Sequence, residues 1–200
     1  MRSEFYTFVR MIAFKNTKAT SELVEILNLQ AQNLSSVLSD EVQKSQGFVT
    51  VQHDLPLLQD MAEKHGHAVA VDNHQVVGYA LVMLSSFRDR IAILQPMFDR
   101  LAHLTYQGRS LPTYDYFVMG QVCVAEGYRG KGVFGGLYEQ LKISMAPFFD
   151  VVITEVATRN QRSLRAHQKI GFKTLEAYTA DTGDGWNVLL WDLRDSIPDE

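Results

Sequence analysis

The feature that most constrains the fold is a strand, a glycine-rich loop and a helix at residues 116–145. A β-prone apolar run occupies residues 116–124, and apolar side chains recur at helical spacing from Phe134 to Met145. Between them lie three glycines and two cations, namely Gly127, Arg129, Gly130, Lys131 and Gly132. Glycine lets backbone N–H groups approach a ligand closely, and a helix start has unpaired N–H groups with a partial positive charge. The pattern therefore predicts a binding site for a phosphate or pyrophosphate.

Length and composition indicate one globular domain over residues 1–200. The chain has 46% hydrophobic and 21% charged residues, and its net charge of −4 gives no reason to expect a nucleic-acid partner. Cys123 is the only cysteine, which excludes an internal disulfide, and the scattered histidines suggest no metal site. No apolar stretch reaches the roughly 18 residues of a membrane span, and the N-terminus lacks a signal-peptide pattern. We therefore expect a cytoplasmic protein without a membrane partner.

Periodicity and turn residues predict alternating helices and strands. The expected strands are residues 6–14, 68–72, 76–84, 116–124, 151–156, 173–180 and 186–193. The expected helices are residues 19–33, 40–46, 55–64, 134–145 and 160–170, with two further helical pieces in 88–108, separated at Pro96. We expect Thr20 or Ser21 to cap the first helix and Ser39 the second, and Gly171 to end the last. Residues 109–112 read as a loop, and Gly120 within its strand suggests a bulge.

Three kinds of phosphate-binding loop compete for the glycine-rich segment. A Walker A loop needs Ser or Thr after its lysine, and Gly132 follows Lys131, which excludes that type. A dinucleotide fingerprint matches literally, since Gly130, Gly132 and Gly135 fit G-x-G-x-x-G. However, five residues separate Val124 from Gly130, and most of the chain precedes the motif. A Rossmann-type oxidoreductase is therefore the third-ranked hypothesis.

The third kind of loop is a coenzyme A site. Residues 122–134 resemble the acetyl-CoA-binding motif of the GNAT-type N-acetyltransferases, [R/Q]-x-x-G-x-[G/A], which follows the fourth strand of that family. Arg129 and Gly132 match the first two fixed positions. Phe134 departs from the third, where glycine or alanine is usual, although its backbone N–H is still available to a phosphate.

The next strand and helix carry a second resemblance to the same family. Its members have an Asn after the fifth strand, then a small residue, a Tyr and Gly-Phe at helical spacing. Asn160, Ser163, His167 and Gly171-Phe172 occupy these positions. Helical geometry independently places the first three on one face, where a polar stripe can flank the pantetheine arm. The two motifs stand in the expected order, and together they select CoA over the dinucleotide.

The resemblance implies a single α+β domain with the GNAT fold. Its sheet would be mixed and mostly antiparallel, with six to seven strands, helices on both faces and splayed central parallel strands. The cofactor core would lie at about residues 116–172, and the acceptor-side elements at about 20–64 and 87–112. The implied reaction moves an acetyl group from acetyl-CoA to a primary amine, on a small molecule or a peptide, by direct attack. A homodimer is compatible with this assignment.

The resemblance also implies the residues of the site. The cofactor-binding candidates are Val122, Cys123, Val124, Arg129, Gly130, Lys131, Gly132, Val133, Phe134, Gly135, Asn160, Ser163 and His167. The catalytic candidates are His167, which replaces the Tyr that protonates the CoA thiolate, and Glu155, which could act as a base through water. Strand alternation turns Cys123 away from its neighbours, which favours a buried apolar role over an acyl carrier.

Two questions stay open at this point. The basic residues Arg159, Arg162 and Arg165 fit either the 3′-phosphate of CoA or a solvated helix face. Since no residue is an obvious general base and two family positions differ, a non-catalytic acyl-CoA-binding or sensing module of the same fold is the alternative to an enzyme.

Overall fold

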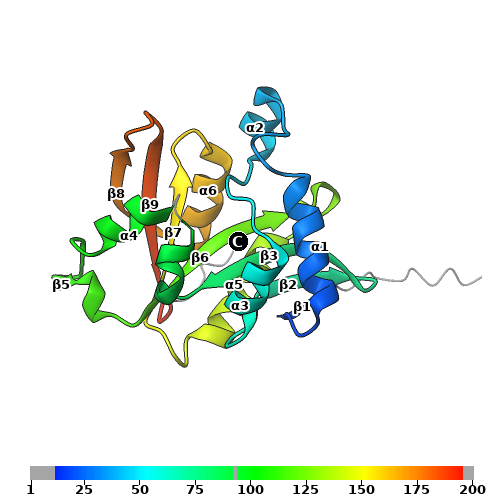
Figure 1. The fold of residues 1–200 in the computed structure, drawn as a ribbon, viewed down its shortest axis with the longest axis horizontal. Coiled ribbons are helices and arrows are strands. Elements are labelled where there is room, and N and C mark those ends of the chain that lie inside the picture. The colour runs from blue at the N-terminus through cyan, green and yellow to red at the C-terminus, as the bar shows by residue number, and fades with distance from the viewer. Residues whose placement is uncertain (1–11, 92–93, 196–200) are drawn as a thin grey trace, which may run out of the picture.

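A seven-stranded sheet forms the centre of the molecule (Figure 1). The computed structural model describes residues 12–91 and 94–195. The sheet order is β1-β2-β3-β6-β7-β9-β8, and every neighbouring pair is antiparallel except β6 and β7. The strands are β1 (Ala13–Asn16), β2 (Ala68–Asp72), β3 (Gln75–Met83), β6 (Tyr116–Val124), β7 (Val151–Ala157), β8 (Lys173–Thr179) and β9 (Gly185–Asp192). The predicted mixed, mostly antiparallel α+β sheet is confirmed.

Helices cover both faces of this sheet, and each face has its own apolar core. The first face carries α1 (Thr20–Ala31), α3 (Leu55–Ala62) and α4 (Gln95–Leu101), and the second carries α5 (Val133–Met145) and α6 (Gln161–Ile170). Figure 1 is viewed from the side of the first face. The central strands supply both cores because successive side chains point to opposite faces. Val118 and Ile153 lie in the first core, whereas Phe117 and Val152 lie in the second.

The parallel pair at the centre of the sheet is short. β6 and β7 pair only where Tyr116–Val118 faces Val151–Ile153. Beyond this point β6 stays bonded to β3, and β7 stays bonded to β9. The hydroxyl of Thr154 donates to the carbonyl of Met119 over 3.0 Å. The predicted splay of the two central parallel strands is therefore confirmed.

Most helix ends follow from local sequence. Ser39 caps α2 (Asp40–Gln46) by accepting the N–H of Val42, and Gly171 ends α6 with φ 111°. The predicted cap of α1 by Thr20 or Ser21 is wrong, because Ala19 occupies that position. The carboxylate of Glu22 instead accepts the N–H groups of Lys18 and Ala19, which supplies the missing acceptor from within the first turn.

In three other segments the observed helices and strands can be compared with those predicted. The predicted strand at residues 6–14 lies mostly outside the described residues, and β1 begins at Ala13. Residues 105–110 form a hairpin of β4 (Thr105–Tyr106) and β5 (Arg109–Ser110), which we did not predict. Gln107 and Gly108 turn it with φ values of 48° and 75°. Two helical pieces are present as expected, a 3₁₀ helix, Ser85–Arg90, and α4. The expected break at Pro96 is wrong, because Pro96 lies in the first turn of α4, where its missing N–H costs no hydrogen bond.

The bulge expected at Gly120 is also present. The register between β3 and β6 shifts between the pairs Ala80–Val122 and Val82–Met119, so Gly120 and Gln121 stand opposite a single residue of β3. The bulge lies beside the point where β6 leaves β7. It therefore re-aims the side chains of β6 just where the sheet opens.

Candidate active site

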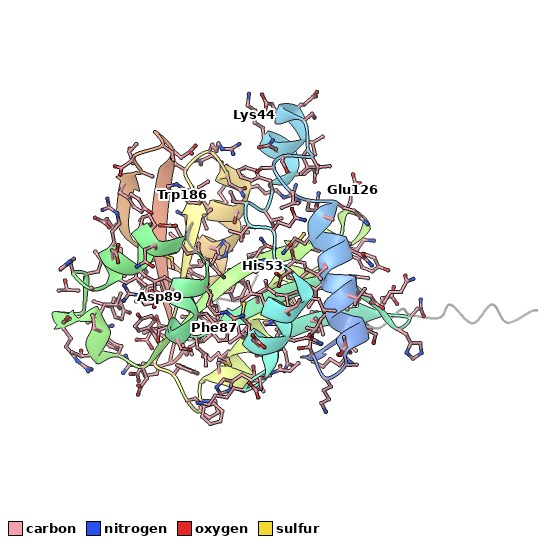
Figure 2. The ribbon with its side chains drawn as sticks, viewed as in Figure 1. Lys44, His53, Phe87, Asp89, Glu126 and Trp186 are labelled. Carbon is pink, nitrogen blue, oxygen red and sulfur yellow. The ribbon has the colours of Figure 1, made fainter. Side chains whose placement is uncertain are left out.

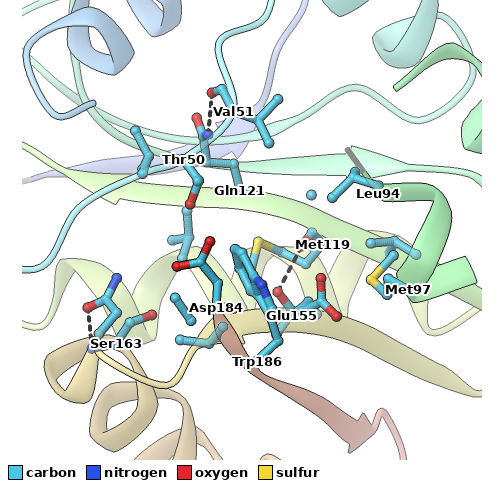
Figure 3. A pocket seen from close by; sticks show the side chains of 18 of the residues that line it. Thr50, Val51, Leu94, Met97, Met119, Gln121, Glu155, Ser163, Asp184 and Trp186 are labelled. Carbon is cyan, nitrogen blue, oxygen red and sulfur yellow. Dashed lines mark hydrogen bonds between the residues drawn. The ribbon is translucent and has the colours of Figure 1, made fainter. Parts of the chain in front are cut away.

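A cavity of about 350 Å³ lies where β6 and β7 diverge (Figure 3). Its walls come from β6 at residues 118–122, β7 at 154–157, the segment 48–51, the start of α4, the β8–β9 end and the start of α6. Glu155 lies two residues after Ile153 and therefore on the same face of the sheet, the α4 side, whereas His167 belongs to the α6 side. The cavity therefore joins the two faces of the sheet through the gap between its central strands.

The glycine loop that follows β6 is open on its outer side. Gly130 and Gly132 have φ values of 71° and 74°, which few other residues adopt. A Cβ atom added at Gly130, Gly132 or Gly135 would meet no atom within 4 Å. By contrast, the space beside Gly136 is filled by the ring of Phe14. The first amides of α5 have no intrahelical partner, so the loop forms an open cradle of donors that fits a pyrophosphate.

Arg129 ties this loop to the rest of the protein. Its Nε donates to the carbonyl of Val124 over 2.9 Å, and its Nη atoms donate to Gln46 Oε1 over 3.2 Å and Asn33 Oδ1 over 2.6 Å. The guanidinium group therefore joins the loop to the ends of α1 and α2. Lys131 is exposed, with its Nζ 5.7 Å from the ring centre of Tyr128. Of these two cations, Lys131 is exposed and Arg129 is half-buried.

The strand residues of the predicted site alternate as expected. Val122 and Val124 pack against the core under α5, and Cys123 lies in the core under α1. Burial raises the pKa of the Cys123 thiol to about 12, so the thiol is protonated and a poor nucleophile at neutral pH. Val133 is buried, so only its backbone N–H can serve a ligand. The side chain of Cys123 therefore contributes packing and leaves the backbone to line the gap.

The predicted polar face of α6 borders the cavity. Asn160 caps the helix, and its Oδ1 accepts the N–H of Ser163 over 3.3 Å. Its Nδ2 donates to the carbonyl of Phe48 over 3.0 Å. Ser163 is half-buried and His167 is 1% exposed, and both line the cavity with Asn160. The structure thus brings these three predicted residues together, with the amide of Asn160 bonded to the segment before α3.

His167 sits in an aromatic cage. The rings of Phe134, Tyr138 and Phe172 surround it at centroid distances of 5.2, 5.5 and 5.1 Å. Its Nδ1 lies 2.8 Å from the carbonyl of Ser163, and its Nε2 lies 2.7 Å from the hydroxyl of Tyr138. Burial lowers the pKa of His167 to about 4, so at pH 7 the ring is neutral, with Nδ1 donating and Nε2 accepting. Its role as an acid stays a prediction, and both ring nitrogens are already engaged.

Glu155 lies on the other side of the gap, where Figure 3 shows it with Trp186 and Met97. The hydroxyl of Tyr178 donates to Glu155 Oε1 over 2.5 Å. Burial raises the pKa of Glu155 above its ordinary value, while the bond from Tyr178 and the charge of Arg100 partly oppose this rise. A carboxylate with a raised pKa is suited to take a proton from an amine.

Sequence reasoning missed a buried polar network beside the cavity. Gln121 Oε1 accepts from Gln30 and from the hydroxyl of Tyr79, each over 2.7 Å, and its Nε2 donates to the carbonyl of Val51 over 2.8 Å. Gln30 Nε2 also lies 2.9 Å from Nδ1 of His53, which lies close to α1 (Figure 2). The network fixes the segment that precedes α3 against β6. Its only sequence signal was a glutamine on the otherwise apolar face of α1.

The arginines at the start of α6 hold α2. Arg159 donates to Gln43 Oε1 over 2.6 Å, and its guanidinium stacks on Phe48 at 4.3 Å. Arg162 donates to the carbonyl of Ser45 over 2.8 Å and to Gln46 Oε1 over 3.0 Å. Both side chains thus bind a neighbouring helix, and their contact with the 3′-phosphate of CoA stays a prediction. Arg165 is exposed.

Within residues 12–91 and 94–195, no three His, Cys, Asp or Glu side chains are grouped so that they could hold a metal ion. No helix in the same ranges is long and apolar enough to cross a membrane.

Comparison with solved structures shows the same fold in several acetyltransferases. The ribosomal-protein-S18-alanine N-acetyltransferase from Escherichia coli superposes with a TM-score of 0.59 at 11% identity, over 95% of this chain and 97% of that chain. An N-acetyltransferase from Staphylococcus aureus gives 0.59 at 17% identity, over 92% and 99%. A chain of the NatC complex bound to Gag peptide and CoA gives 0.59 at 12% identity, over 90% and 98%.

Sequence comparison gives the family. No curated protein matches the chain significantly. The profile of the Acetyltransferase (GNAT) family, however, matches residues 24–172, which include β6, the glycine loop and α6. The match spans well over half of the sequence and both halves of the candidate site. The chain therefore belongs to the GNAT acetyltransferase family.

Proposed function

We propose that this protein transfers an acetyl group from acetyl-CoA to a primary amine by direct attack. The observation that carries the proposal is the cavity between β6 and β7, which runs from the side of α6 to the side of Glu155. A donor-rich, open loop follows the same strand β6. Membership of the GNAT family and the CoA named for one structural neighbour support the choice of cofactor.

In this proposal the chain holds the cofactor mainly through its backbone. The cradle at Gly130, Gly132 and Gly135 receives the pyrophosphate, helped by the charge of Lys131. The N–H groups of Val133 and Phe134 belong to the same helix start. The backbone of residues 122–124 and the polar groups of Asn160 and Ser163 flank the pantetheine arm. Bound acetyl-CoA supplies the acyl thioester that the amine attacks. Arg129 acts indirectly, by fixing the loop.

Glu155 and His167 take separate roles in the proposed chemistry. Glu155 accepts the proton of the acceptor amine, directly or through water, because its raised pKa makes it a stronger base than an exposed carboxylate. His167 is the candidate donor to the CoA thiolate. Because its ring is neutral at pH 7, it must first take up a proton from water, which its pKa of about 4 makes unfavourable. Since a thiol has a pKa of about 8.5, the thiolate leaves readily, and we expect this proton transfer to contribute only modestly to the rate.

One observation favours a second candidate function. Both ring nitrogens of His167 and the amide of Asn160 already have protein partners. A chain that only binds acyl-CoA, as a sensor, needs neither group for chemistry. The two functions differ in turnover and not in affinity, so a binding measurement alone does not separate them.

The test combines calorimetric titration of acetyl-CoA with release of CoA thiol across a panel of amines. We expect saturable binding and amine-dependent CoA release. Binding without turnover on any amine would support the sensor, and absence of binding in the micromolar range would refute both. Titration with a nicotinamide dinucleotide serves as the control for the Rossmann hypothesis, and we expect no binding.

A further inference from the structure

The α4 side of the cavity is apolar and aromatic. Leu94 and Met97 contribute from the start of α4, and Tyr178 and Trp186 contribute from β8 and β9, where they are paired across the two strands. Trp186 lies at the end of β9 that pairs with Ala157, beside the start of α6 (Figure 2). Burying an apolar or aromatic group of a ligand against such a wall is energetically favourable.

The charges on this side of the cavity are negative. Among the described residues that line the cavity, the charged side chains are Glu155 and Asp184, with no Lys or Arg. Tyr178 bonds to one carboxylate oxygen of Glu155, and a carboxylate accepts bonds on both oxygens. Figure 3 shows Asp184 and Glu155 on the same side of the cavity as Trp186. The lining therefore favours a cation, and its described residues offer no cationic side chain to an anionic group.

Arg100 packs against the tyrosine of this wall. The guanidinium of Arg100 lies 3.7 Å from the ring centre of Tyr178, and its Nη1 lies 3.0 Å from Glu176 Oε1. Its charge is thus shared between an aromatic face and a carboxylate. Arg100 supports the position of Tyr178 and is not among the residues that line the cavity.

We infer that the acceptor is a small primary amine that carries one apolar, preferably aromatic, group and no carboxylate. Glu155 would recognise its ammonium group, while Trp186, Tyr178 and Met97 would contact the apolar group. This inference rests on the proposed transferase function for the reaction, and it names the substrate. A second cation would have to leave the apolar wall to reach Asp184, which forfeits the contact of the ligand with Trp186 and Tyr178. A carboxylate would face Glu155 and Asp184.

The test uses four amines that differ in these features. 2-Phenylethylamine fits the inference, phenylalanine adds a carboxylate, 1,4-diaminobutane adds a second cation, and ethanolamine lacks the apolar group. We expect kcat/KM for 2-phenylethylamine to exceed each of the others by at least about tenfold, the discrimination that a hydrophobic pocket gives per methylene or more. The same amines are titrated calorimetrically into the protein saturated with CoA, and only 2-phenylethylamine should bind at micromolar to low millimolar concentration.

Variants locate the binding site. Trp186→Ala should lower kcat/KM for 2-phenylethylamine about tenfold or more, mainly through KM, and Trp186→Phe should restore most of it. Met97→Gln should act in the same direction by placing an amide in the apolar wall. Phe148→Ala is the matched control, since Phe148 is an aromatic residue with 60% exposure outside the cavity lining.

The outcomes separate the inference from the function on which it rests. If the diamine, ethanolamine or phenylalanine is acetylated best, the inference is wrong and the transferase function stands. If 2-phenylethylamine binds the CoA complex but no amine is acetylated, the ligand class stands and the transferase proposal fails. If no amine binds or reacts, both fail. Equal loss of activity in the Phe148 and Trp186 variants would also overturn the location.

Discussion

The hydroxyl of Tyr178 on β8 donates a 2.5 Å hydrogen bond to the carboxylate of Glu155 on β7, across the intervening strand β9. This bond lowers the pKa of Glu155, while burial of the carboxylate raises it, and burial is the larger effect. Burial and the bond from Tyr178 thus act in opposite directions on the basicity of the one carboxylate on β7 in the cavity wall. They can be separated by substitution.

Glu155→Gln is expected to lower kcat by about 100-fold or more, because general-base catalysis typically contributes ~10²–10⁴-fold. The acid limb of the pH profile of kcat should lie above the ordinary pKa of a glutamate and disappear in the variant. Tyr178→Phe should move that limb to higher pH, since it removes the bond that lowers the pKa. Glu63→Gln, at an exposed position after α3, is the control. A pH profile unchanged in both Glu155 and Tyr178 variants would remove Glu155 from the mechanism.

His167→Phe is expected to lower kcat more than it weakens CoA binding, if His167 gives its proton to the thiolate. The size should be modest, and smallest above about pH 8.5, where a thiolate needs no acid. The variant also leaves the buried hydroxyl of Tyr138 without its 2.7 Å partner, which costs about 1–3 kcal/mol of stability. Urea denaturation measures this separately. A stable variant with an unaltered rate at pH 7 shows that His167 is not the acid.

The two cations of the glycine loop should have different effects when substituted. Arg129→Ala removes three hydrogen-bond donations within the protein and should lower the free energy of unfolding by about 1–3 kcal/mol. Lys131→Ala should leave stability unchanged and weaken CoA binding several-fold, with the effect diminishing at high salt. Calorimetry and urea denaturation on both variants check this. The reverse pattern would place Arg129 on the pyrophosphate.

Gly132 allows a matched pair of substitutions in the same cradle. Gly132→Ala strains the backbone at φ 74°, and Gly132→Asp adds a negative charge to a similar strain. We expect the Asp variant to bind CoA at least about tenfold more weakly than the Ala variant, because the charge repels the pyrophosphate. Equal affinities in the two variants would indicate that the phosphates lie elsewhere.

Stability should fall on mild acidification. Burial lowers the pKa of His53, His67 and His167 from 6.5 to about 4 each. Between these values the unfolded chain binds more protons than the folded protein, so stability is fully present above pH 6.5 and is lost as pH falls toward 4. Each histidine corresponds to about 3 kcal/mol by the linkage relation. Urea denaturation between pH 4 and 7.5 measures the slope.

Histidine variants separate this effect from general acid denaturation. His53→Gln removes one of the three groups and should flatten the pH dependence of the free energy of unfolding. His103→Gln, at an exposed position, should leave the slope unchanged. A slope that is the same in both variants would mean that the buried histidines do not control acid stability.

The sequence predicted those parts of the fold whose determinants are local. The strand–loop–helix at β6 and α5, and the helix bounded by Asn160 and Gly171, follow from periodicity and caps within a few residues. The β4–β5 hairpin was missed because its strands have two residues each, too few to show alternation. The cap of α1 was misassigned because no hydroxyl caps this helix. The acceptor is the carboxylate of Glu22, the third residue of the first turn, which bonds to the N–H groups of Lys18 and Ala19.

The sequence predicted which residues belong to the site better than it predicted their hydrogen-bond partners. Family motifs place Arg129 and His167 in the site but do not say that their polar atoms are bonded to Asn33, Gln46 and Tyr138. Those partners are separated from them by 96, 83 and 29 positions, and such pairings depend on how the helices pack. The aromatic wall around Glu155 depends in the same way on the order of β7, β9 and β8.

The two halves of the sheet meet along a seam of only three residue pairs, between Tyr116–Val118 and Val151–Ile153. Each half is otherwise a separately bonded antiparallel block. This short paired segment sets how far apart β6 and β7 lie where the cavity opens between them. Phe117 and Val152 within it are fully buried and line no part of the cavity. We therefore expect substitutions of Phe117 or Val152 to change the shape of the cavity through the position of the strands and not through a contact with a ligand.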